Sequence, residues 1–322
     1  MTGRIHILLA AVLIAVSCTV EPMPETTDMI PLELCTSSAD PVKGLAMLDK
    51  EAIKSQRFGL FAYTETGMSW LRNNEMVFSR SENGLDYWES EEAAYWPLGA
   101  RLDIFAYAPY QDGLTVTSYE NGIPVLTVTP SSDVREQVDF CIAAPQFGKA
   151  ARDAVHVAFE HTLTRVRFYI NVSEGTPSGK RYKLSELTLS GVAASNTIKY
   201  SAAAGQTFTW SEIAQTDPLE GAYTLTDDML TDDYLILENS LTDEEGFDRY
   251  TYVNNPVEGG LYLLPQSMTV AAKVGLSVDV YTEIEDTWQK EATLSPIQIS
   301  LPEGSEWKAG GTVSYTFTVT IP

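Results

Sequence analysis

Val313-Ser-Tyr-Thr-Phe-Thr-Val-Thr-Ile321, near the end of the 322-residue chain, is the stretch that decides the fold class. Its apolar residues fall at every second position, so Val313, Tyr315, Phe317, Val319 and Ile321 share one face, and Ser and Thr residues share the other. A period of two is typical of a β-strand with one buried face. Residues 166–172 and 276–281 alternate in the same way. The pattern predicts a protein built from half-buried strands.

The rest of the chain predicts many short strands and little helix. Residues 114–128 have the pattern of a hairpin, in which Asn121-Gly122 supplies the positive φ angles of a tight turn. Residues 102–107 are almost continuously apolar, as expected of a strand buried on both faces. Helical turns are expected only at 50–56 and 133–137. Short strands without long helices predict an all-β fold of antiparallel sandwiches with Greek-key connections.

The length of the chain suits two domains of roughly 150 residues each. A stretch of small and charged residues at 148–154 is the expected boundary, which gives an N-terminal β-sandwich over 29–150 and a C-terminal one over 155–322. The acidic segment 227–248 is expected to be a solvated surface insertion.

The net charge of the chain indicates which kinds of binding partner to expect. The 21 Lys and Arg residues against 44 Asp and Glu residues leave a formal net charge of −23. Such a chain repels phosphate backbones, so we expect no nucleic-acid partner. The fractions of hydrophobic residues (44%) and charged residues (20%) are those of a globular protein.

The N-terminus has the features of an export signal. Arg4 precedes ten apolar residues at 7–16, too short a run for a membrane span of roughly 20 residues, so residues 1–17 are expected to be a signal peptide. The following Ala15-Val16-Ser17-Cys18 resembles the lipobox of bacterial lipoproteins. That resemblance implies cleavage before Cys18 and a lipid anchor, with palmitate, on this residue. Residues 18–28 would then be a polar tether. An ordinary secretory signal with an incidental Cys is the alternative.

Little in the sequence indicates chemistry. His156 and His161 face opposite sides of an expected strand and cannot share a metal ion, and a hydrogen-bonded place in the core is expected for His161. The acidic pairs 227–228, 232–233 and 244–245 lack the spacing of a tight calcium loop, although weak surface binding of calcium stays open. We expect no catalytic residue, no metal site and no cofactor, and therefore no enzyme.

Two further cysteines, Cys35 and Cys141, belong to expected strands of the N-terminal sandwich. An oxidising envelope would permit a disulfide bond between them. We favour two free, buried thiols that pack as small apolar residues, and the bond stays the alternative.

Six motifs occur in the order seen in fimbrillin-like proteins, which this chain resembles over about residues 30–320. They are Phe58-Gly-Leu-Phe-Ala-Tyr63, Tyr95-Trp96-Pro97, Leu102-Asp-Ile-Phe-Ala-Tyr-Ala-Pro109, Val157-Ala-Phe-Glu-His-Thr-Leu-Thr-Arg-Val166, Leu264-Pro-Gln-Ser267 and Trp307-Lys-Ala-Gly-Gly-Thr-Val-Ser-Tyr-Thr-Phe317.

The resemblance implies two tandem transthyretin-like β-sandwiches, exported as a lipoprotein to the outer membrane and the cell surface. Such proteins are structural subunits or accessory components (anchor or tip) of type V fimbriae, and they serve cell adhesion. In the family a protease cuts the loop after the first strand and releases the lipidated peptide. The exposed groove then accepts a C-terminal strand of the next subunit, so the implied partners are other fimbrial subunits or further copies of the chain in a head-to-tail polymer.

On this chain the first strand would be residues 29–36 and the cleavable loop residues 37–57. The candidate processing residues in that loop are Lys43, Lys50, Lys54 and Arg57. The candidate donor strand is the alternating stretch Val313, Tyr315, Phe317, Val319 and Ile321, for which a plain C-terminal edge strand is the alternative. Stalk, tip and anchor roles stay open.

A second function also stays open, namely a surface lipoprotein that does not polymerise and binds a glycan or a host ligand. It would use exposed aromatic residues, although each candidate could instead be a core residue. The candidates are Tyr87, Trp88, Tyr95, Trp96, Trp210 and Trp288.

Overall fold

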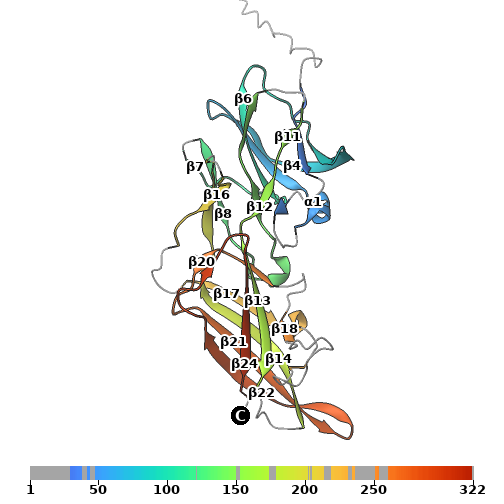
Figure 1. Cartoon of the computed structure of the whole chain (residues 1–322), viewed down its shortest axis with the longest axis vertical. Helices are drawn as coiled ribbons and strands as arrows, with labels where there is room; N and C mark the ends of the chain where they lie inside the picture. The colour runs from blue at the N-terminus through green and yellow to red at the C-terminus, as the bar shows by residue number, and fades with distance from the viewer. Residues whose placement is uncertain are drawn as a thin grey trace, which may run out of the picture.

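The structure of the protein is a computed structural model. It describes residues 30–37, 42–43, 48–120, 122–149, 153–173, 179–201, 203, 205–213, 219–230, 234–235, 251–253 and 260–320. The expected signal peptide, Cys18 with its tether, and Ile321 lie outside these residues. Within them, strands make up almost all the regular structure, and the predicted all-β class is confirmed (Figure 1).

The first part of the chain folds into a ten-stranded sheet with the order β11-β1-β5-β4-β3-β6-β9-β12-β2, with β10 paired to β6. All its pairings are antiparallel except β1 with β11 and β2 with β12. The bounds are β1 Glu33–Ser37, β2 Val42–Lys43, β3 Phe58–Thr64, β4 Ser69–Glu82, β5 Leu85–Ser90, β6 Arg101–Ala108, β9 Cys141–Ala143, β10 Gln146–Lys149, β11 Val155–His156 and β12 Phe159–His161.

The two apolar strands β3 and β6 lie side by side in this sheet because both of their faces are buried. Leu60 and Ile104 face one hydrophobic cluster, and Phe61 and Phe105 face a second one on the other side. The expectation that residues 102–107 are buried on both faces is therefore confirmed.

A smaller sheet of order β16-β15-β8-β7 covers the second cluster. It contains the predicted hairpin as β7 Ser118–Glu120 and β8 Ile123–Val128, with Gly122 at a φ of 81° and Asn121 outside the described residues. The other strands, β15 Asn196–Tyr200 and β16 Phe208–Trp210, come from the second half of the chain. Strand pairing thus crosses the expected boundary at 148–154, both in this sheet and where β11 and β12 join the large sheet, and the division into two domains stays a prediction.

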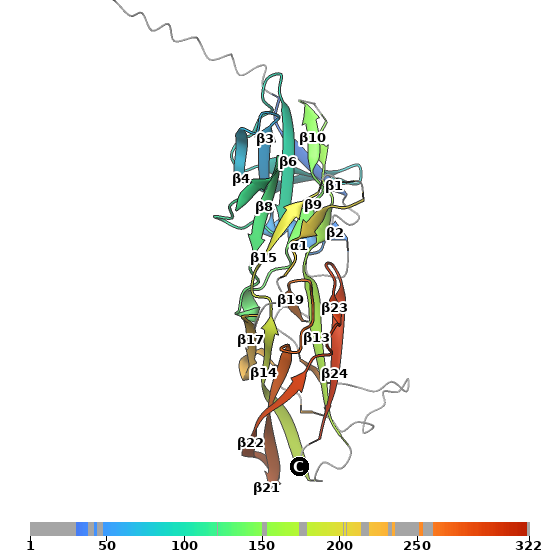
Figure 2. The ribbon, with the colours of Figure 1, turned by 90° about the vertical axis from the view of Figure 1, so that its left-hand side faces the viewer.

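The second half forms two further sheets around one core, at the other end of the long axis (Figure 2). One has the order β17-β14-β21-β22, and in the other β13 pairs with β18, β19 and β24. The bounds are β13 Thr164–Val172, β14 Lys180–Val192, β17 Gly221–Thr226, β18 Thr251–Val253, β19 Leu261–Leu263, β21 Lys273–Ile284, β22 Thr287–Ser300 and β24 Thr312–Val319, with the short pair β20 Gln266–Ser267 and β23 Glu306–Trp307 beside them.

Alternate side chains of these strands enter the core, as the sequence predicted. Val166, Phe168, Ile170 and Val172 of β13 are all buried, while Arg167 and Tyr169 between them are half-buried. The strand expected around Cys141 is β9, which begins at this residue and is three residues long.

Helix is limited, among the described residues, to the two predicted places and one further turn. These are α1 Lys50–Gln56, η2 Val134–Glu136 and η3 Asp227–Met229. Asp49 caps α1, since its carboxylate accepts hydrogen bonds from the backbone N–H groups of Glu51 and Ala52 at 2.9 and 2.8 Å. In the part of the chain that is described, no helix is long and apolar enough to cross a membrane.

Trp88 of β5 is one of two tryptophans in the first core, 0% exposed and in edge-on contact with Phe58 at a ring distance of 5.0 Å. Trp88→Ala is expected to lower the free energy of unfolding by about 3–5 kcal/mol because it opens a large cavity. Chemical denaturation of the mature chain measures this. Trp70→Ala is the control, since Trp70 is 38% exposed and should lose about 1 kcal/mol or less. Equal losses in the two variants would contradict the packing described.

Candidate functional site

Strand β1 lies inside the large sheet rather than at its edge. It pairs with β5 in antiparallel register, Glu33 opposite Glu89 through Ser37 opposite Leu85, and with β11 in parallel register on its other side. The backbone carbonyl of Cys35 accepts a hydrogen bond from Val157 N at 2.8 Å, just beyond β11. Within the expected first strand, residues 29–36, strand structure begins at Glu33 and has a hydrogen-bonded neighbour on each side, and residue 29 lies outside the described residues.

The inward side chains of this segment complete the first core. Leu32 and Leu34 are buried in the same cluster as Phe58 and Trp88. Thr36 is also buried, and its hydroxyl accepts a hydrogen bond from Trp88 Nε1 at 3.1 Å. β1 therefore acts as an apolar wall with one polar contact at its end.

Two of the four candidate processing residues are held by carboxylates. Lys54 of α1 lies 3.4 Å from the fully buried carboxylate of Asp86 and 3.5 Å from Glu51. Arg57 pairs with Glu75 and lies 3.8 Å from Glu91. Both side chains are thereby fixed against the sheet.

The two carboxylates beside Arg57, Glu75 and Glu91, have pKa values shifted in opposite directions. The hydrogen bond from Arg57 lowers the pKa of Glu75, and the hydrogen bond shared with Glu75 raises the pKa of Glu91. Of the other two candidates, Lys43 ends β2 and Lys50 begins α1.

The candidate donor strand is β24, which pairs in parallel with β13 from Thr312 opposite Arg165 to Val319 opposite Val172. Among the described residues β13 is its one strand partner, so β24 lies at an edge. Val319 is buried, whereas Val313, Tyr315 and Phe317 are half-buried. An edge position fits both the donor strand and the plain edge strand that the sequence left open.

Aromatic contacts hold β24 in place. Tyr315 and Phe317 stack with Phe168 at ring distances of 5.9 and 6.2 Å, and Trp307 Nε1 donates to the Tyr315 hydroxyl at 2.8 Å. These rings are only half covered, so the strand is packed on one face and open on the other.

The aromatic residues considered for ligand binding lie deeper than that role requires. Trp88 and Trp96 are core residues, which is the alternative that the sequence left open for them. The others, Tyr87, Tyr95, Trp210 and Trp288, are half-buried. A cavity of about 630 Å³ instead has Tyr63, Tyr110, Asn73 and Glu75 in its lining. Sequence reasoning missed it because its residues come from separate strands and loops.

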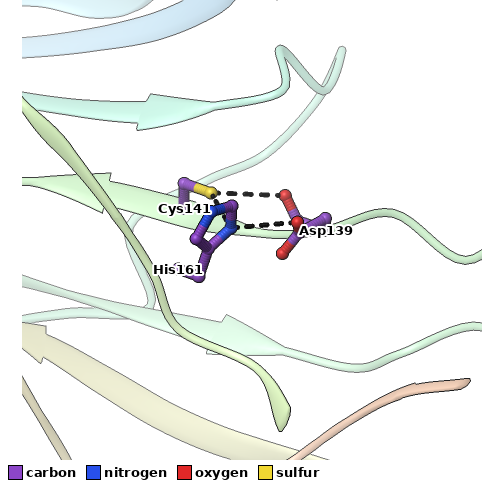
Figure 3. A group of neighbouring side chains, drawn as sticks. All are labelled: Asp139, Cys141 and His161. Atoms are coloured by element: carbon purple, nitrogen blue, oxygen red, sulfur yellow. Dashed lines mark hydrogen bonds and ion pairs between the residues drawn. The ribbon is translucent and has the colours of Figure 1, made fainter. Parts of the chain in front are cut away.

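A cluster of three buried side chains lies at the start of β9 and the end of β12 (Figure 3). His161 Nδ1 is 2.9 Å from Asp139 Oδ2 and 3.2 Å from Cys141 Sγ. The sequence predicted a hydrogen-bonded core place for His161, and this is confirmed. It missed Asp139 and Cys141 as the neighbours, which the Asp-x-Cys spacing and the strand register bring together.

Both described thiols are buried and free, as the sequence favoured. Cys35 Sγ contacts the Ala154 carbonyl at 3.9 Å. Burial raises the pKa of the Cys141 thiol well above its usual value. This Cys–His pair therefore lacks the exposed, acidic thiol of a cysteine nucleophile.

The proteins to which this chain is similar are fimbrial proteins. The family model described as fimbrillin-like matches residues 47–321. The fimbrium subunit Fim1C of Phocaeicola vulgatus is 24% identical over 340 aligned positions, which cover 93% of this chain and 86% of that protein. A fimbrial protein from Bacteroides vulgatus, solved as a crystal structure, superposes with a TM-score of 0.62 at 18% identity and covers 91% of this chain and 95% of its own. The structural similarity to the Bacteroides vulgatus protein supports the all-β fold described above.

The Lys54–Asp86 pair connects α1 to β5, the strand that holds β1. Lys54→Ala leaves the buried carboxylate of Asp86 without its cation and is expected to lower the free energy of unfolding by about 2–4 kcal/mol. Chemical denaturation measures the change, and adding Asp86→Asn should restore part of it. The surface pair of Lys180 with Glu291 is the control, since Lys180→Ala should lose about 1 kcal/mol or less. If Lys54→Ala behaves like this control, the pair does not hold the helix.

Proposed function

This chain belongs to the fimbrillin-like family, and we propose that it is a structural subunit or accessory component of a surface fimbrium that assembles by protease-assisted strand exchange. Its relatives are fimbrial proteins rather than enzymes. The observation that carries the proposal is the place of β1, which is both a wall of the core and the strand that comes after the expected lipid anchor.

Removal of β1 would create an acceptor groove. The backbone groups of β5 and β11 that now pair with β1 would lose their partners, and so would Val157 N and Trp88 Nε1. Unpaired groups next to apolar surface are unfavourable, because each has lost its hydrogen bonds without full access to water. Such a groove favours capture of another extended strand.

The strand β24 has the properties of a donor. Its apolar side chains recur with the same period of two as Leu32, Leu34 and Thr36, the inward residues it would replace. In its own subunit it pairs with β13 alone among the described strands, whereas the groove offers it both β5 and β11. A second hydrogen-bonded neighbour would offset the loss of the first. Addition of this kind does not close on itself and so gives an open filament.

Cleavage in the 37–57 loop would separate the anchor from the subunit. Because Lys54 and Arg57 are fixed by carboxylates, we place the cut at Lys43 or Lys50. Either cut removes β1 together with Cys18, whose lipid would hold the uncut protein at the outer membrane.

The donor strand is tested with protein cut in this loop and a synthetic peptide of residues 312–322. We expect the peptide to bind the cut protein and to inhibit its oligomers. Phe317→Asp in the peptide should weaken binding by roughly 10–100-fold, because a large apolar side chain no longer fills its pocket. Titration calorimetry measures the affinity, and Thr316→Asp on the polar face of the strand is the control.

The control peptide should bind about as well as the native one. Two results would contradict the proposal: no binding of the native peptide to cut protein, or equal weakening by the two substitutions. Failure of the native peptide to bind would favour the alternative function, a surface lipoprotein that does not polymerise.

The anchor is tested separately in cells. Cys18→Ala should abolish lipid labelling and move the protein from the membrane fraction to the soluble fraction, because the thiol that carries the lipid is missing. Metabolic labelling with a palmitate analogue and fractionation measure both effects, with Cys35→Ala as the control. Unchanged labelling of Cys18→Ala would refute the lipoprotein assignment.

A further inference from the structure

Asp139, Cys141 and His161 bring a carboxylate, a thiol and an imidazole together inside the protein (Figure 3). Their side chains are 3%, 0% and 5% exposed, and the three ligand atoms lie within 4.8 Å of one another. These are three different metal-binding groups in one buried place.

Strand geometry makes the three side chains meet. Asp139 and Cys141 are two residues apart on an extended segment and so share a face. His161 lies directly opposite Cys141 in the antiparallel register of β9 and β12, where paired side chains are closest neighbours. Thr162 fixes this end of the pair, since its N–H and its hydroxyl both donate to the Phe140 carbonyl, at 3.0 and 2.6 Å.

The charge of Asp139 is poorly compensated in this place. Among the described ion pairs it has no Lys or Arg partner, and its Oδ2 atom makes no hydrogen bond of good geometry despite lying 2.9 Å from His161 Nδ1. A buried carboxylate in this state is unfavourable unless a cation neutralises it. A cation bound by Asp139 and the imidazole would neutralise this carboxylate.

We propose that Asp139, Cys141 and His161 bind a zinc-type divalent ion. A thiolate with an imidazole suits zinc and related transition metals, whereas calcium and magnesium prefer oxygen ligands alone. Tetrahedral zinc with Zn–S ~2.3 Å and Zn–N ~2.0 Å would set its ligand atoms about 3.3–3.6 Å apart. The observed 3.2 Å between Sγ and Nδ1 and 2.9 Å between Nδ1 and Oδ2 need to open by only a few tenths of an ångström.

The ion would act as a structural clip. It deprotonates the thiol, releases the proton to solvent and leaves one tetrahedral position for water. Cys141 and His161 are 20 residues apart in sequence, so the ion would join β9 to β12 and restrain the connection between them. The competing explanation is a metal-free network, in which Nδ1–H donates to Asp139 and the thiol donates to the Asp139 carbonyl at 3.6 Å.

The test measures metal bound by the full mature chain after unfolding with a chelator and refolding with zinc, then dialysis. We expect close to one zinc per chain by elemental mass spectrometry. A hundredfold excess of zinc over its dissociation constant should raise the unfolding midpoint by about 4 °C relative to chelator. Cobalt(II) in place of zinc should give a thiolate charge-transfer band, which reports sulfur as a ligand.

Cys141→Ser and His161→Gln keep polar side chains of similar size and should lose the bound metal, and Cys141→Ser should also lose the cobalt–thiolate band. The matched controls are Cys35→Ser, a buried thiol outside the cluster, and His156→Gln, an exposed imidazole, and both should keep the metal. The proposal fails if the wild type retains no zinc, or if the metal survives loss of both Cys141 and His161. A cobalt spectrum without a thiolate band would likewise overturn it, since it places the ion on surface carboxylates. None of these readouts depends on fimbrial assembly.

Discussion

The antiparallel pairing of β3 with β6 is the interaction on which the rest of the first half depends. Six residue pairs, from Gly59 opposite Tyr107 to Thr64 opposite Leu102, join two strands that are apolar on both faces. Each face anchors a different cluster, so the two hydrophobic cores share one wall. Gly59 makes this close packing feasible, because a Cβ at that position would lie 2.1 Å from the Tyr107 ring. Strands that cover either face are placed relative to this pair.

Our proposal places two demands on β1. The strand would have to stabilise the uncut monomer, and it would have to leave after cleavage. The structure meets the first demand through Leu32, Leu34 and the contact of Thr36 with Trp88. Departure would be favoured because the chain between β1 and α1 lies within the expected cleavable loop 37–57, and because the neighbouring strand β11 is only two residues long. The inward side chains of β1 thus stabilise the uncut protein, whereas the proposed release of β1 depends on its neighbours in the sheet and on the loop that follows it.

Local sequence pattern predicted many of the strands, but it could not predict which distant strands pair with each other. Alternation identified the strands at 166–172 and 313–319, and the apolar run at 102–107 was correctly given two buried faces. The sequence did not indicate that β24 pairs in parallel with β13, or that β8 pairs with β15 from the other half, because register between distant segments leaves no local signal. Trp88 and Trp96 show the same limit, since an aromatic residue on a strand fits a core and a ligand surface equally well. The Asp139, Cys141 and His161 cluster needed the register of β9 and β12 before it could be found.

The segment 153–161 runs from the neighbour of β1 to the buried cluster. Its first part forms β11 beside β1, and its last part forms β12 beside β9, so a few residues join strands that lie far apart in the order of the large sheet. If β1 leaves, β11 loses its partner, and the segment is then held through β12 and its continuation into β13. The backbone bonds of Thr162 and the His161 cluster lie at that end. A metal ion bound there would hold β12 in position after β1 has left. It would thereby keep one side of the proposed groove ordered until a donor strand binds.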